Sequence, residues 1–94
     1  MTADLTIYEM DYATKNGRQQ IIYTVITTIQ NRDLIEQIES VGMQSWYLSS
    51  ESGAEFELLG SEIKKFLPQI QKINKNVTEK DFIDEDFYRL SLSY

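Results

Sequence analysis

The sequence contains no cysteine and no histidine. Without cysteine the chain can form no disulfide and holds no thiolate nucleophile, and this absence fits a reducing compartment. Without histidine it lacks the commonest general base and the commonest metal ligand of proteins. A serine nucleophile would therefore have no histidine to activate it. We expect a protein that is not an enzyme and that binds no cofactor or metal.

Long apolar runs and basic clusters are also missing. No segment approaches the roughly 18 apolar residues of a membrane-spanning helix, and residues 1–12 lack the basic and apolar regions of a signal peptide. We therefore expect a cytoplasmic protein. Nine Lys and Arg against 15 Asp and Glu give a net charge of −6. This charge disfavours direct binding to nucleic acid or to an anionic membrane.

Strand-forming residues are concentrated near the N-terminus. The 94 residues, 41% hydrophobic and 12% aromatic, suffice for one globular domain over residues 1–94. Residues 19–29 are rich in β-branched and aromatic side chains, and Asn16-Gly17 just before them is the strongest signal for a type I′ hairpin turn. We expect residues 5–12 to pair with residues 19–29, and we predict that residues 19–29 form the central strand.

The turn position fixes the register of this hairpin. Counting outward from the turn places three side-chain pairs on one face, which we expect to form the main core contact: Tyr12 with Ile21, Met10 with Tyr23, and Tyr8 with Val25. The opposite face is polar near the turn and apolar at its far end, where Ile7 should lie opposite Ile26. A strand pair that is apolar on both faces either has another layer of the protein packed on each face or lies at an interface.

Periodicity and end signals predict the following elements. These are a helix after Asn31 or Asp33 that ends at Gly42, a hairpin of residues 44–49 and 54–59, and a helix from Ser61 to Val77. Pro68 lies inside the second helical pattern and should kink it near residues 64–67 or divide it. Thr78 with Asp81 resembles a capping box and predicts a further turn of helix through about Asp86.

The chain ends in an amphipathic strand pattern over residues 87–94. A terminal strand must pair with a free edge of its own sheet or with another subunit. The predicted order is therefore ββα–ββα–β. We expect a single small α+β domain with a mainly antiparallel sheet and two helices packed on one sheet face.

Acidic side chains occur as two pairs on predicted strands and as one cluster: Glu9 with Asp11, Glu55 with Glu57, and Asp81 with Asp84, Glu85 and Asp86. Neither pair has the apolar surroundings that would make one carboxyl an acid and the other a base. The cluster lacks the alternate spacing and the central glycine of a calcium loop. We interpret it as a solvated surface or as a patch that faces a partner.

The second helical pattern has a basic face made of four lysines: Lys64, Lys65, Lys72 and Lys75. Residues 61–77 carry a net charge of +3, from four Lys and one Glu, whereas residues 31–60 carry −5, from one Arg and six acids. We interpret this polarity as charge balance within the molecule. The alternative is that it steers association or holds a self-complementary dimer.

Six tyrosines and one tryptophan are many for a chain of 94 residues. Three of these aromatic residues are expected in the core, where they supply burial that a small domain needs: Tyr12, Tyr23 and Trp46. By contrast, Tyr47, Tyr88 and Tyr94 are difficult to place inward together. Exposed aromatic side chains are favoured anchors of protein interfaces.

These features lead to a first hypothesis of a protein-binding module or inhibitor that is not an enzyme. It would dock an acidic, tyrosine-bearing surface on a basic site of a larger protein. The residues expected to contact the partner are Glu55, Glu57, Asp84, Glu85, Asp86, Tyr47 and Tyr88. Anti-restriction and anti-CRISPR proteins and nucleic-acid mimics are of this physical type, which is an analogy of type and not of sequence.

Two alternatives remain open at this point. A homo-oligomer, for instance a homodimer, could bind a small ligand at the subunit junction. Its subunit edge would be the last strand, with Leu90, Leu92 and Tyr94. The other alternative is a structural subunit of a larger assembly, which would be incompletely stable when isolated.

Overall fold

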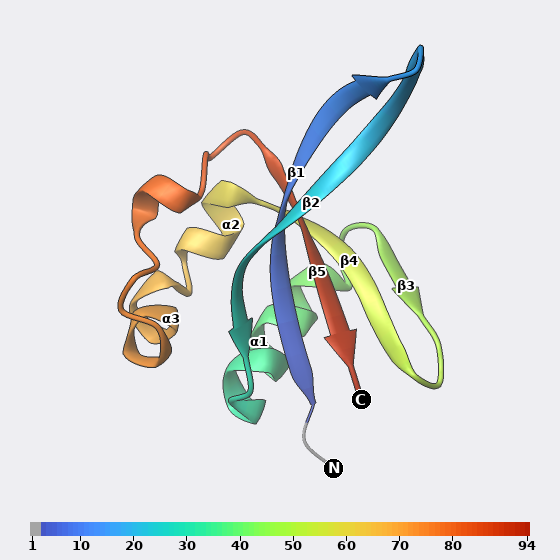
Figure 1. Ribbon diagram of the computed structural model, residues 1–94. Helices are drawn as coiled ribbons and strands as arrows, with labels where there is room; N and C mark the ends of the chain where they lie inside the picture. Colours follow the sequence, from blue (N-terminus) through green and yellow to red (C-terminus); the bar gives the residue numbers. More distant parts are fainter. Residues whose placement is uncertain (1–2) are drawn as a thin grey trace.

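A computed structural model describes residues 3–94 and contains one antiparallel sheet with helices on one face (Figure 1). In chain order the elements are β1 Asp4–Lys15, β2 Arg18–Ile29, α1 Arg32–Gly42, β3 Tyr47–Ser49, β4 Gly53–Leu59, α2 Gly60–Lys64, α3 Leu67–Ile73, the 3-10 helix η1 Glu79–Asp81 and β5 Phe87–Ser93. The five strands lie in the order β2-β1-β5-β4-β3. The α+β class and the mainly antiparallel sheet are thus confirmed.

The last strand of the chain lies in the middle of the sheet. β5 pairs with β1 on one side and with β4 on the other, whereas β2 is an edge strand. The prediction that residues 19–29 form the central strand is therefore wrong. The prediction of a subunit edge on the last strand is also wrong, because Leu90 and Leu92 are buried in the chain's own core. Strand propensity reports a fit to a pleated surface and not a position within the sheet.

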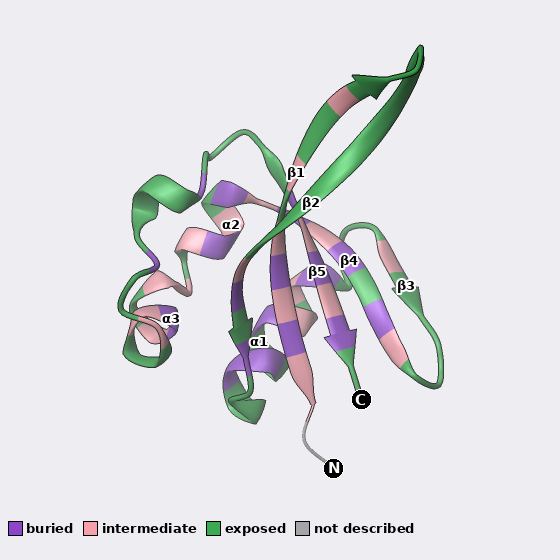
Figure 2. Cartoon of the chain, in the orientation of Figure 1, coloured by how far each residue is buried: buried purple, intermediate pink, exposed green. Residues whose placement is uncertain are grey.

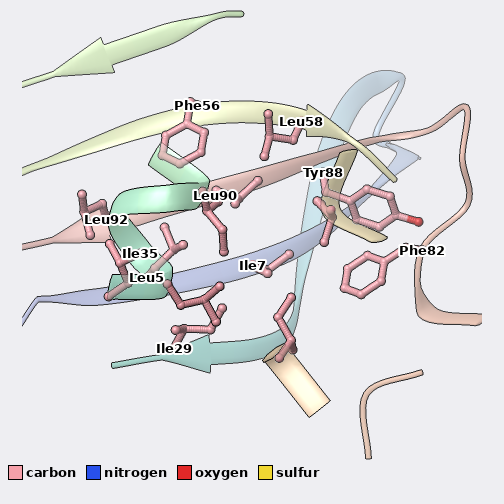
Figure 3. Packing of buried hydrophobic residues seen from close by; sticks show 14 of the residues in the cluster. Leu5, Ile7, Ile29, Ile35, Phe56, Leu58, Phe82, Tyr88, Leu90 and Leu92 are labelled. Atoms are coloured by element: carbon pink, nitrogen blue, oxygen red, sulfur yellow. The ribbon is translucent and has the colours of Figure 1, made fainter. Parts of the chain in front are cut away.

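One hydrophobic core lies between the sheet and the helices (Figure 3). Its strand residues include Leu5, Ile7, Ile29, Ala54, Phe56, Leu58, Tyr88, Leu90 and Leu92, and its other residues include Leu34, Ile35, Ile38, Ile63, Ile70, Val77 and Phe82. Full burial of such a side chain contributes about 1.5–3 kcal/mol. Because β5 supplies the middle of this layer, packing on both neighbouring strands depends on it.

The hairpin register near the turn agrees with the prediction. Asn16 and Gly17 both have positive φ, 54° and 74°, as a type I′ turn requires. All three predicted side-chain pairs of β1 and β2 are found, including Tyr12 opposite Ile21. The prediction that they form the main core contact is wrong, because Ile21 and Val25 are also exposed. Between Ile7 and Tyr8 the register shifts, so Ile7 lies opposite Thr27 instead of Ile26. A bulge of this kind adds one residue to β2 and bends the hairpin at its base.

The outer part of this hairpin projects from the domain and is here called the arm, residues 10–23 (Figure 1). β5 pairs with β1 only as far as Glu9, so the arm extends past the last strand beside it. Figure 2 shows the arm exposed over nearly its whole length. The predicted core location of Tyr12, Tyr23 and Trp46 is wrong, since these side chains are 67%, 45% and 46% exposed. Alternation places side chains on a common face, but it does not say whether a second layer covers that face.

Local end signals were informative for the helices. The side chain of Asn31 accepts a hydrogen bond from the backbone N–H of Leu34 at 3.0 Å and so caps α1. Pro68 divides the second helical pattern, because α2 ends at Lys64 and Pro68 lies in the first turn of α3. Of the helices in residues 3–94, none is long and apolar enough to cross a membrane.

Two end signals act differently from the prediction. Gly42 does not adopt a left-handed conformation, and its missing Cβ matters because an added Cβ would overlap the ring of Phe56. The turn after Thr78 is shorter than predicted, since η1 ends at Asp81. There the backbone N–H of Thr78 donates to the Asp81 carboxylate at 2.8 Å.

Candidate docking surface

The sheet has a second face, which no helix of the described residues covers. Its side chains alternate along each strand with those of the core. This surface, here called the open face, comprises Tyr8, Met10, Tyr12, Ile21, Tyr23, Val25, Trp46, Leu48, Glu55, Glu57, Phe87, Arg89 and Ser91. It therefore combines residues from every strand, and its aromatic side chains come from segments far apart in the sequence.

Arg89 of β5 organises the centre of the open face. Its guanidinium carbon lies 4.8 Å from the ring centroid of Trp46 and 5.8 Å from that of Tyr23. Such cation–π contacts contribute about 0.5–1 kcal/mol each at exposed sites. Tyr23 belongs to the edge strand β2, and Trp46 directly precedes the opposite edge strand β3. Arg89 thus holds two aromatic rings in place across the width of the sheet.

The charge of Arg89 is balanced on the same face. Its Nη2 lies 3.0 Å from Glu57 Oε1, and its Nη1 lies 3.6 Å from Glu55 Oε2. The Arg89 side chain is only 19% exposed. Both glutamates were predicted to contact a partner, and the structure instead pairs them with a neighbouring strand. Their role toward a partner stays a prediction, but Arg89 offsets one of their two negative charges.

A hollow opens beside Arg89. It has a volume of about 420 Å³ and is lined by Tyr8, Tyr23, Glu55, Arg89 and Ser91. Tyr8 and Tyr23 meet edge to face with ring centroids 6.0 Å apart, a favourable arrangement of aromatic pairs. The hollow is therefore lined by two aromatic rings and by an ion pair, which suits an inserted side chain from a partner.

The other predicted acids lie at the end of the sheet where β5 begins. Asp84 pairs with Lys64 of α2 at 2.7 Å, which agrees with charge balance within the molecule at that lysine. Glu85 and Asp86 line a second hollow, of about 330 Å³, together with Glu9 and Asp11 of β1. Met10, Tyr12, Phe87 and Tyr88 complete its lining. The structure thus brings two acidic pairs together beside the open face and separates them from Glu55 and Glu57.

Tyr88 is not an exposed anchor. It is 3% exposed, and its hydroxyl accepts a hydrogen bond from the backbone N–H of Ile83 at 2.7 Å. Burial raises the pKa of Tyr88 above its ordinary value. The alternation of β5 points this residue into the core, so the prediction that its ring anchors a partner is wrong.

Tyr47 also lies on the core side of the sheet. Its ring stacks on Phe56 with centroids 5.8 Å apart, and its hydroxyl donates to the Glu39 carboxylate at 2.8 Å. Burial, followed by the hydrogen bond to Glu39, raises the pKa of Tyr47 to about 12. The third tyrosine of this predicted group, Tyr94, is 46% exposed and lies beyond the end of β5, away from the open face.

Sequence reasoning missed the residues at the centre of the open face, and a signal for them was present. The alternation that points Tyr88 and Leu90 inward necessarily points Phe87 and Arg89 outward. An outward Phe and Arg on a strand match the composition of interface cores. The pairing of Arg89 with Trp46 had no local signal, because residues 50–86 separate β3 from β5 in the sequence.

Among residues 3–94, no group of three or more acidic side chains is arranged to hold a metal ion. Comparisons of the chain with protein-family models, with curated proteins and with solved structures found no match. The function is therefore inferred from the chain's own surface.

Proposed function

We propose that this chain is a protein-binding module, not an enzyme, and that its open face docks on a larger protein. The observation that carries the proposal is the cation–π contact of Arg89 with both Trp46 and Tyr23, on a sheet face that no second layer of residues 3–94 covers. Tyr, Trp, Phe, Met and Arg are the residues enriched in protein interfaces. The open face contains all five types, whereas Lys is absent from it.

Preorganisation favours binding through this face. Ordering a side chain at an interface costs about 0.5–1.5 kcal/mol. Because Arg89 already holds Trp46 and Tyr23, and Tyr8 packs on the edge of Tyr23, part of this cost is met in the free protein. Trp, Tyr and Arg are also the commonest binding hot spots. We therefore assign the main binding energy to Trp46, Tyr23 and the hollow beside Arg89.

The charges around the open face indicate the kind of partner. Arg89 is neutralised by Glu55 and Glu57, while Glu85 and Asp86 stand with two further acids at the base of the arm. A partner with an apolar site and a basic rim fits this pattern, and opposite charges would speed its association at low salt. Since Arg89 offsets one of the two glutamate charges, this group keeps a net charge of only −1, and the surface favours aromatic docking over mimicry of a nucleic acid. We place the interaction in the cytoplasm, because a chain without cysteine fits a reducing compartment.

A pull-down with matched variants tests the proposal. Tagged wild-type protein, the double variant Tyr23→Ala/Trp46→Ala and the control Tyr94→Ala are incubated with cytosol of the source organism at low and high salt. Tyr94 is a suitable control because its side chain is as exposed as that of Trp46, 46% in both, but lies off the open face. Bound proteins are quantified by mass spectrometry, and thermal melts monitored by circular dichroism establish that all three proteins are folded.

The proposal predicts one near-stoichiometric protein that is retained by the wild type and by Tyr94→Ala. This protein should be lost from the double variant and reduced at high salt. Calorimetry with the purified partner should then show at least a tenfold weaker affinity for the double variant, which corresponds to about 1.4 kcal/mol. Equal retention by the wild type and the double variant would contradict docking through the open face, as would an empty wild-type pull-down.

A further inference from the structure

The β2 strand leaves one long backbone edge unpaired within residues 3–94, since it is the first strand in the sheet order. The residues that flank a two-residue hairpin turn form a hydrogen-bonded pair, and such pairs alternate along the ladder. Counting from Lys15 opposite Arg18, the β2 residues that direct N–H and C=O away from β1 are Gln19, Ile21, Tyr23 and Val25. Four successive outward positions of the edge can therefore receive another strand.

This edge lacks the devices by which proteins keep strand edges apart. Such edges usually carry a charged side chain, a proline or a bulge. No charged residue and no proline occurs between Arg18 and Arg32, and none of the chain's 15 acids lies between Asp11 and Asp33. The register shift lies at the base of the hairpin, opposite Ile7 and Tyr8, and leaves the arm itself regular. Several apolar side chains of this strand are exposed to solvent, among them Ile21, which is 42% exposed.

We propose that β2 pairs in antiparallel fashion with β2 of a second copy of this chain, across a two-fold axis. Two identical strands in antiparallel pairing form a self-complementary contact, as a two-fold dimer requires. The dimer would join the two sheets edge to edge. The open faces stay accessible on both copies, so this proposal does not depend on the proposed function.

Charge favours a second copy as the occupant of this edge. Two copies of a chain with net charge −6 repel one another except where they meet through a segment free of acids. The edge of β2 is such a segment. The unpaired edge of β1 in the arm is not, because it lies beside Glu9, Asp11, Glu85 and Asp86. A partner with a basic rim would form no ion pair along β2, because β2 carries no acid. A second copy would meet no acidic side chain on β2 that could repel its own acids.

The outward groups also define the register. An axis at Ile22 places Ile21 opposite Tyr23 of the second copy and Gln19 opposite Val25, and it uses all four outward positions. It also places the two Ile22 side chains side by side, with Cβ atoms about 5 Å apart. These side chains lie on the face of the arm opposite to Tyr23, because successive residues of a strand alternate. A substitution at Ile22 therefore places the new side chain directly beside its copy in the second chain, and it does not alter the open face.

Sedimentation equilibrium over a range of concentrations tests the dimer. The variants are Ile22→Glu and the matched control Ile83→Glu, whose wild-type side chains are 50% and 58% exposed. We expect a wild-type dimer and a dissociation constant about tenfold or more higher for Ile22→Glu, since two carboxylates then oppose one another at close range and Asp11, the β1 partner of residue 22, adds a further negative charge in each copy. The constant for Ile83→Glu should be unchanged. A wild-type protein that stays monomeric up to roughly 1 mM, or equal weakening by both variants, would overturn the proposal.

Amide hydrogen exchange locates the interface independently of any substitution. The N–H groups of Ile21 and Tyr23 face away from β1 and should exchange rapidly in the monomer, whereas those of Ile22 and Thr24 bond to β1 in every state. Raising the concentration across the dissociation constant should slow exchange at the outward amides, which include Ile21 and Tyr23, and should leave Ile22 and Thr24 unchanged. A dimer in which these two amides stay unprotected would use a different surface and would overturn the proposal.

Discussion

The body of the sheet and the arm have opposite polarity, and strand β1 shows this most clearly. In the body, Leu5 and Ile7 face the helices and are fully buried. Two and four residues further along, on the same face, stand Glu9 and Asp11, where no helix covers the strand. In the arm most of the apolar side chains are instead on the open face, as with Tyr12, and Ile22 is an exception. The apolar face of a strand thus changes sides where the cover of the helices ends.

This reversal indicates which surface of the arm is suited to contact with a partner. The acids Glu9 and Asp11 favour exposure to water of the face of the arm opposite to the open face. The aromatic and β-branched side chains of the open face favour burial instead. An exposed apolar surface of this extent is typical of an interaction site. The same comparison explains the edge of β2, which carries no acid although acids are frequent elsewhere in the chain.

The largest expected effect distinguishes the two regions by stability. Phe56→Ala removes a fully buried ring that stacks with Tyr47 and should lower the free energy of unfolding by about 3–5 kcal/mol. Phe87→Ala, at a ring that is 53% exposed, should change it by less than about 1 kcal/mol. Urea denaturation of both variants measures the difference. Similar losses in the two proteins would show that the open face is packed, contrary to the comparison.

A smaller effect is expected at Arg89. Arg89→Gln removes the cation between Trp46 and Tyr23 and leaves Glu55 and Glu57 without their partner. We expect a loss of about 1–2 kcal/mol in unfolding free energy and a lower fluorescence anisotropy of Trp46, the only tryptophan. The control is Arg32→Gln, at an exposed ion pair of α1, which should change neither quantity measurably. Unchanged anisotropy of Trp46 in Arg89→Gln would show that other contacts hold the ring.

The turn of the arm provides a test of local effect. Gly17→Ala forces a side chain into a backbone conformation with φ of 74° and should cost about 1 kcal/mol. Because the arm extends past β5, faster amide exchange should appear in residues 10–23 and not in β4 or β5. Hydrogen exchange measured by mass spectrometry gives the distribution. A uniform acceleration over the whole chain would mean that the arm and the body unfold as one unit.

The smallest effect at neutral pH concerns Tyr47. Its folded pKa of about 12 exceeds the ordinary value of 10.0, so the neutral hydroxyl stabilises the folded state. This contribution is fully present below pH 10 and is lost as the pH rises toward 12, where the unfolded chain ionises more readily. Between pH 10 and pH 12 the free energy of unfolding should therefore fall less in Tyr47→Phe than in the wild type. Part of the decline should remain in the variant, because the pKa of Tyr88 is also raised. Identical alkaline profiles in thermal melts would contradict the assignment.

Much of the local structure could be read from the sequence. The turn Asn16-Gly17 set the register of the arm, Asn31 identified the start of α1, and Pro68 divided the second helical segment. Alternation also sorted the side chains of the arm correctly onto two faces, as far as the register shift next to Ile7. These features depend on residues close together in the chain, where backbone conformation and hydrogen bonding are decided by immediate neighbours.

The tertiary structure alone decided which of those faces became the core and which strand became the centre. Residues 19–29 have the strongest strand pattern, yet β2 is at the edge and β5 lies between β1 and β4. Whether Tyr23 is buried depends on where the helices pack, and whether it meets Arg89 depends on pairing between distant segments. The sequence by itself determined the elements, their faces and the charge pattern. Only long-range packing decided the strand order and the open face, because burial and contacts between remote segments are properties of the assembled chain.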